Sequence, residues 1–124
     1  MTLNPSGESR PVTPGAVELV FEAHNWALVQ LRGECDLNTR KALAEALERA
    51  SQRGAVLVDL SHCSFIDGTV IGTLVVGSQT LRARGGRLDL VVPPRARAIQ
   101  RIVGISGLTT LVRVHDTRRA GLAS

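Results

Sequence analysis

Apolar and polar residues alternate near the start of the chain and recur at helical spacing further on. Val17, Leu19 and Phe21 lie on one side of a predicted half-buried strand. A second strand is predicted over residues 26–31. His24-Asn25 lies between the two runs and can turn the chain, so the sequence predicts a hairpin.

The first helical pattern follows a predicted loop over residues 33–38. It runs from about Thr39 to Gln52, with Asp36 or Asn38 as the N-terminal cap and Gly54 as a left-handed stop. Its predicted buried stripe consists of Ala42, Leu43, Ala46, Leu47 and Ala50.

A second helix is predicted from Asp67 to about Arg84, after a predicted loop over residues 61–67. Its predicted inner side consists of Val70, Ile71, Leu74, Val75, Ser78 and Leu81. We expect the apolar side chains of Val70, Ile71 and Val76 to lie in the core rather than at an interface. Gly72 and Gly77 weaken the helix and permit close packing against a neighbour.

A third helix is predicted to open at Pro93-Pro94 and to break at Gly104. Three further apolar runs predict strands at residues 55–60, 87–92 and 111–114. The run at 55–60 is continuously apolar except for one aspartate, which is typical of a central strand that is covered on both faces.

The predicted order is therefore β-β-α-β-α-β-α-β, which indicates an α/β fold. We expect a mixed, mostly parallel sheet of four or five strands with three or four helices and right-handed crossovers. With 124 residues the chain is the size of one domain. We expect residues 1–15 to form a flexible tail, 16–115 the folded domain, and 116–124 a loosely attached C-terminal tail.

The charge is +4, and Lys41 is the only lysine, so arginine carries nearly all the positive charge. A basic surface can bind nucleic acid or an acidic protein, but charges spread over a solvated surface are the favoured interpretation. The residues that could form a basic face are Arg82, Arg84, Arg87, Arg95, Arg97 and Arg101.

The sequence contains no motif that indicates catalysis or metal binding. No nucleophile motif, phosphate loop or metal-ligand spacing is present, so we expect a protein that is not an enzyme and that has no metal or other cofactor. Cys35 and Cys63 are far apart in sequence and outside any C-x-x-C motif, which favours buried, reduced thiols. With no signal-peptide pattern and no membrane-length apolar run, we expect a cytoplasmic location.

The most informative segment joins the strand at 55–60 to the helix that Asp67 caps. Ligands and partners of open α/β sheets meet the carboxyl ends of the strands. The N–H groups that follow Asp67 favour an anion such as a phosphate or a carboxylate. The alternative is that Asp67 serves only as a helix cap.

Several pieces of the sequence resemble the STAS domain, and within it the anti-sigma factor antagonists. The matching pieces are Gly33-Glu34-Cys35-Asp36-Leu37, Val58-Asp59-Leu60-Ser61, Phe65-Ile66-Asp67 with Gly72 and Leu74, Arg84-Gly85-Gly86-Arg87-Leu88, and Ile102-Val103-Gly104-Ile105-Ser106-Gly107-Leu108. Their order and spacing cover about residues 17–114.

This resemblance implies a partner switch. Family members bind an anti-sigma factor, often a kinase, and so free a sigma factor. The kinase phosphorylates a Ser or Thr directly after the loop aspartate, and the added charge of roughly −1.5 to −2 opposes binding. The resemblance implies partner-binding roles for Asp36, Asn38, Asp67, Gly68, Thr69 and Val70.

The sequence departs from the family at the phosphoacceptor position. Gly68 follows Asp67, and Val70 stands where the family has a glycine. Either Thr69 is the phosphoacceptor, or the switch is lost. We favour loss, because one residue along a helix turns the side chain by about 100°.

Two other functions remain open. One is a STAS module in another assembly, such as a lipid-transport complex, for which Gly68 is no obstacle. The other is nucleic-acid binding by the arginines, which the scarcity of aromatic stacking residues disfavours.

Overall fold

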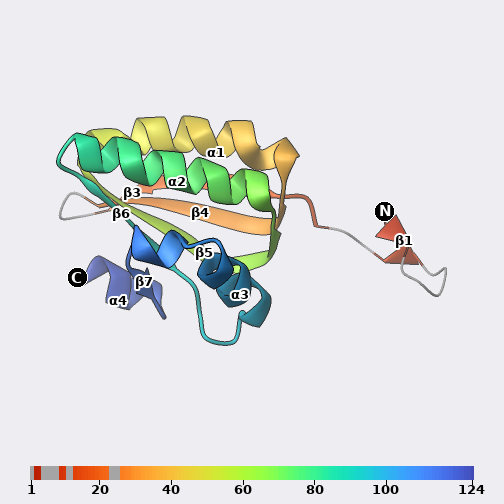
Figure 1. Ribbon diagram of the computed structural model, residues 1–124. Helices are drawn as coiled ribbons and strands as arrows, with labels where there is room; N and C mark the ends of the chain where they lie inside the picture. The colour runs from red at the N-terminus through yellow and green to blue at the C-terminus, as the bar shows by residue number, and fades with distance from the viewer. Residues whose placement is uncertain (1, 4–8, 11–12, 23–25) are drawn as a thin grey trace.

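A computed structural model describes residues 2–3, 9–10, 13–22 and 26–124 (Figure 1). The predicted turn at His24-Asn25, and much of the predicted tail over 1–15, lie outside these residues. The strands are β1 (Thr2–Leu3), β2 (Ser9–Arg10), β3 (Ala16–Phe21), β4 (Trp26–Cys35), β5 (Ala55–Ile66), β6 (Arg87–Val91) and β7 (Val114–His115). The helices are α1 (Leu37–Ala50), α2 (Gly68–Ala83), α3 (Arg97–Ile105) and α4 (Arg118–Leu122), with short 3-10 turns η1 (Ser51–Arg53) and η2 (Leu108–Thr110).

Five strands form one mixed sheet in the order β3-β4-β5-β6-β7. β3 and β4 pair antiparallel, as the predicted hairpin requires, and the other pairs are parallel. The predicted α/β fold with a mixed, mostly parallel sheet is therefore confirmed. β1 and β2 pair with each other in a separate two-stranded sheet.

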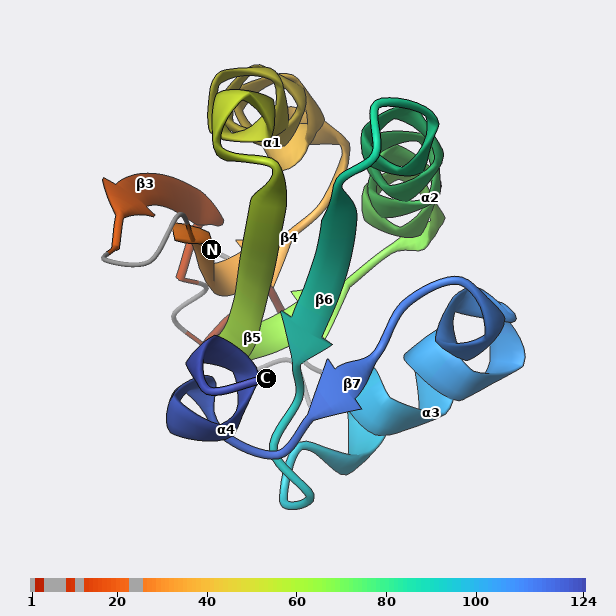
Figure 2. The same ribbon diagram turned by 90° about the vertical axis from the view of Figure 1, so that its left-hand side faces the viewer.

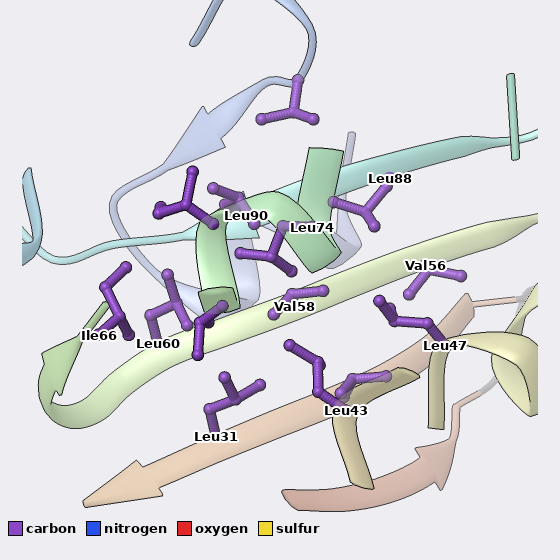
Figure 3. Packing of buried hydrophobic residues seen from close by; sticks show 14 of the residues in the cluster. Leu31, Leu43, Leu47, Val56, Val58, Leu60, Ile66, Leu74, Leu88 and Leu90 are labelled. Atoms are coloured by element: carbon purple, nitrogen blue, oxygen red, sulfur yellow. The ribbon is translucent and has the colours of Figure 1, made fainter. Parts of the chain in front are cut away.

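The main core lies between the sheet and helices α1, α2 and α3. Side chains from β4, β5 and β6 meet those of α1 and α2 there, as Figure 3 shows. Figure 2 shows α1 and α2 side by side over the sheet, with α4 away from them. The sequence predicted most of this core, although Ala42 is exposed and Thr39 takes its place in the buried stripe of α1.

The predicted loop at 61–67 is strand up to Ile66, and the predicted loop at 33–38 is strand up to Cys35 and helix from Leu37. β4 continues to Cys35 and β5 to Ile66, because the two strands stay paired through register shifts at Gln30/Arg32 and Gly33/Glu34. Irregular pairing lets a strand include polar residues without the strict alternation of apolar and polar residues by which a strand is recognised in a sequence.

The elements after β6 also differ from the prediction. α3 begins at Arg97, not at Pro93-Pro94. A turn closed by the Ala96 N–H on the Pro93 carbonyl at 3.0 Å comes before it, and Pro94 disfavours the helical conformation at Pro93. Of the predicted strand at 111–114 only Val114 is strand, in the two-residue β7, and Val112 packs into the core after η2.

In place of a loose tail after Asp116, the structure has α4 on the second face of the sheet. Arg118 donates from Nε and Nη2 to Oδ2 of the buried Asp59, at 3.0 and 2.9 Å. Gly121 lies so close to Leu57 that an added Cβ would be 2.8 Å from its methyl groups. The hydrogen bonds of Arg118 hold α4 against the sheet, because burying the Asp59 carboxylate without a partner would cost free energy.

Within the part of the chain that the structure describes, no helix combines the length and apolarity needed to span a bilayer.

Candidate functional site

The N-termini of α1 and α2 lie next to each other at one end of the sheet. β4 leads through Asp36 into α1, and β5 leads through Asp67 into α2. The two strands are adjacent and parallel, and Cys35 pairs in register with Ile66. The backbone N–H of Asp67 donates to the Cys35 carbonyl at 3.2 Å, which ties the two helix starts together.

Asp36 caps α1 with a reciprocal set of hydrogen bonds. Its Oδ1 accepts from the N–H of Asn38 at 2.9 Å, and its own N–H donates to Oγ1 of Thr39 at 2.8 Å. The cap explains why α1 begins at Leu37, two residues before the predicted start. The side chain of Asn38 is exposed at the same helix end.

Asp67 caps α2 with one carboxylate oxygen. Oδ1 accepts from the N–H groups of Thr69 and Val70 at 3.0 and 3.1 Å and from the Thr69 hydroxyl at 2.6 Å. Burial alone would raise the pKa of Asp67. The hydrogen bonds from the Thr69 hydroxyl and from the backbone of Val70, Thr69 and Leu37 outweigh burial, so its pKa lies below the ordinary value.

The three residues after Asp67 have different surroundings. Gly68 is exposed, and a Cβ at this position would meet no atom within 4 Å. Thr69 is partly exposed, and its hydroxyl is engaged by Asp67. Val70 is fully buried, which confirms its predicted core position, and its side chain has no exposed surface to offer a partner.

A groove of about 840 Å³ runs along the outer side of α1 and α2, beginning beside Thr69. Gly77 brings the helices together, since its Cβ would lie 3.0 Å from Cδ1 of Leu47. A Cβ at Gly72 would meet no atom within 4 Å, which leaves the groove open there. The lining residues are Leu37, Arg40, Lys41, Ala44, Leu47, Glu48, Ser51, Thr69, Gly72, Thr73, Val76, Gly77, Thr80 and Leu81.

Exposed apolar side chains mark this part of the surface. Leu37 and Val76 line the groove and are each 61% exposed, and Phe65, two residues before Asp67, is 48% exposed. The prediction that Val76 belongs to the core is wrong, because it points away from the buried side of α2. Neither Leu37 nor Phe65 is among the residues for which a partner-binding role was predicted from the sequence. The position of Leu37 away from the apolar stripe of α1 could have indicated that its side chain is exposed.

The six arginines considered for nucleic acid do not form one cluster with this site. Arg82 and Arg84 lie near the start of β6, and Arg95 and Arg97 lie beyond its other end. Arg87 is engaged by Asp89 at 3.0 Å and stacks on Trp26. Among the described residues, no group of three His, Cys, Asp or Glu side chains is placed to hold a metal ion.

The cap geometry predicts that Asp67→Ala lowers the free energy of unfolding by about 1–2 kcal/mol at pH 7. A carboxylate with a lowered pKa stabilises the fold above its ordinary pKa near 3.9, and this contribution is lost as the pH falls through the folded-state pKa. Urea unfolding should therefore show the difference from wild type shrinking below about pH 4. The control Glu45→Ala, on the exposed side of α1, should change stability by less than about 0.5 kcal/mol. An equal loss for Asp67→Ala at all pH values would contradict the charged-cap account.

Comparison with known proteins agrees with this architecture. A family model described as "Mlab, STAS domain" matches residues 21–113. An anti-sigma factor antagonist from Mycobacterium paratuberculosis superposes with a TM-score of 0.74 at 21% identity, over 98% of this chain and 97% of that one. Phosphorylated SpoIIAA, a Bacillus cell fate determinant, gives 0.67 at 20% identity over 87% and 97%.

A third solved structure of similar fold comes from a different functional setting. A sulfate transporter family protein from Wolinella succinogenes gives a TM-score of 0.65 at 18% identity, over 97% of this chain and 90% of that one. At these identities the superpositions establish the fold alone, while the family model covers most of the sequence. The chain belongs to the STAS domain family.

Proposed function

We propose that this chain is a cytoplasmic protein-binding regulator that docks a kinase-like anti-sigma factor and thereby frees a sigma factor. The observation that carries the proposal is the joint position of two capped helix N-termini and an open, partly apolar groove on one surface. Membership of the STAS family and the fold shared with anti-sigma factor antagonists support it. No catalytic role is assigned to any residue.

The exposed apolar side chains supply the binding energy in this proposal. Leu37 and Val76 project at the groove, where a partner side chain would remove them from water. A few such buried anchors dominate the energy of most protein interfaces. Arg40 and Lys41 on the same groove favour a partner that carries acidic residues beside its apolar contact.

Asp36 and Asp67 act in this proposal by holding the two helix starts in place for docking. Each side chain is occupied by the N–H groups of its own helix. Asn38, Gly68 and Thr69 then present the surface that the partner contacts, since they are exposed or partly exposed at the same end.

We propose further that the phosphorylation switch is absent, so that docking is constitutive. Gly68 provides no hydroxyl at the family position. The Thr69 hydroxyl is one residue further along the helix and donates to Asp67 at 2.6 Å, which disfavours its use as phosphoacceptor. Its position differs by about 100° around the helix axis.

Docking at the groove predicts that Val76→Glu weakens partner binding by about tenfold or more, because a carboxylate must then be desolvated at an apolar contact. The matched control is Ile105→Glu on α3, which replaces an equally apolar residue that is 76% exposed and away from the groove. Titration of each variant with the anti-sigma factor that copurifies with the wild type measures the difference. Equal binding by wild type and Val76→Glu would contradict docking at the groove.

The absent switch predicts that Gly68→Ser gains phosphorylation. The added side chain has free space, so the fold should be retained. With the copurifying kinase and ATP, Gly68→Ser should take up phosphate, and both wild type and Thr69→Ala should take up none. Phosphate on wild type that disappears in Thr69→Ala would show that Thr69 is the acceptor and would overturn the constitutive proposal.

A second candidate is a STAS module that binds a subunit of a membrane-transport assembly. The fold shared with a sulfate transporter family protein favours this alternative, and so does Gly68, since docking there needs no phosphoacceptor. Copurification of a transport subunit, sensitive to Val76→Glu and insensitive to Ile105→Glu, would support it over the anti-sigma proposal.

A further inference from the structure

The two cysteines of the chain, 28 residues apart in sequence, meet in the folded protein. Sγ of Cys35 lies 3.7 Å from Sγ of Cys63 in a buried hydrogen bond. The contact arises because Cys35 ends β4 and Cys63 lies on the paired strand β5. Both thiols are free, with Cys35 fully buried and Cys63 8% exposed.

We propose that Cys35 and Cys63 form a two-electron oxidation site that a peroxide converts to an intramolecular disulfide. The sulfurs already face each other, and bond formation needs an approach of roughly 1.7 Å, from the observed contact to a bond of about 2.05 Å. No other chain is required, because both partners are in the same core.

The hydrogen bond also makes the two sulfurs unequal. The hydrogen bond with Cys63 lowers the pKa of Cys35 and outweighs burial, which raises it. The same bond, together with burial, raises the pKa of Cys63. Cys35 is therefore the sulfur that more readily becomes the thiolate, which is the nucleophilic form.

The reaction balances with hydrogen peroxide as the oxidant. The Cys35 thiolate attacks one peroxide oxygen, the O–O bond breaks, and the leaving hydroxide takes a proton to become water. This step yields a sulfenic acid on Cys35. The Cys63 sulfur then attacks the Cys35 sulfur, the S–O bond breaks, and the second oxygen leaves as water with the Cys63 proton. Two thiols lose two electrons in total, and one peroxide gains them.

The oxidation site lies directly beneath the two helix caps. Cys35 precedes Asp36, and its carbonyl accepts the N–H of Asp67 at 3.2 Å. A bond between the sulfurs would join the ends of β4 and β5 covalently at this point. We therefore expect oxidation to shift the amide resonances of Asp67 and Asn38 while leaving those of α4 unchanged. This proposal does not depend on which partner the domain binds.

The test exposes the dilute native full-length chain to hydrogen peroxide and follows free thiols and intact mass. The proposal predicts a loss of both titratable thiols and a mass decrease of about 2 Da without dimers. It also predicts a rise in melting temperature on the order of 10 °C, reversed by a thiol reductant. Because burial makes the reaction slower than that of an exposed thiol, the test measures which product forms and not how fast it forms.

Cys35→Ser and Cys63→Ser are the controls, since neither can close the bond. Each should show no mass decrease and no reversible rise in melting temperature. The proposal is overturned if wild type keeps both thiols after a peroxide treatment many times longer than the one that fully oxidises free cysteine in a separate tube. It is equally overturned if wild type yields only oxygenated sulfurs or disulfide-linked dimers.

Discussion

The parallel pairing of β4 with β5 is the constraint on which the rest of the structure depends. These two strands end at the same edge of the sheet, and each passes within one residue into a helix. The hydrogen bond from the Asp67 N–H to the Cys35 carbonyl holds the two ends together. The side-by-side helix N-termini, the groove that begins beside them and the contact between the two cysteines all follow from this pairing.

Different helices cover the two faces of the sheet. α1, α2 and α3 bury the main core, while α4 covers a smaller cluster around Trp26 and Leu57 on the other face. Arg118 and His115 contact the buried carboxylates of Asp59 and Asp89 there, at 2.9 and 2.8 Å, so neither carboxylate is buried without a partner. No segment among the described residues covers the outer side of α1 and α2, which carries the groove and the exposed Leu37 and Val76.

Patterns in the sequence predicted the features that depend on residues close to one another along the chain. The antiparallel pair β3–β4, most of the helix stripes, the caps Asp36 and Asp67 and the stop at Gly54, whose φ is 80°, lie where short-range spacing placed them. Features that depend on distant residues escaped prediction. α4 is held by Asp59, 59 residues before Arg118, and Cys35 finds Cys63 only through strand register. Whether Val70 and Val76 are buried or exposed depends on the rotation of α2 about its axis relative to the sheet. The spacing of apolar residues alone did not show that Val76 is on the exposed side.

We propose that the partner binds on α1 and α2, at the end where both helices begin. Hydrogen–deuterium exchange of the chain, free and bound to its copurified partner, tests this placement most directly. We predict slowed exchange in the first turns of α1 and around Thr69 to Val76, with α3 and α4 unchanged. Protection confined to α3 or α4, with the α1 and α2 segments exchanging as in the free chain, would contradict the account.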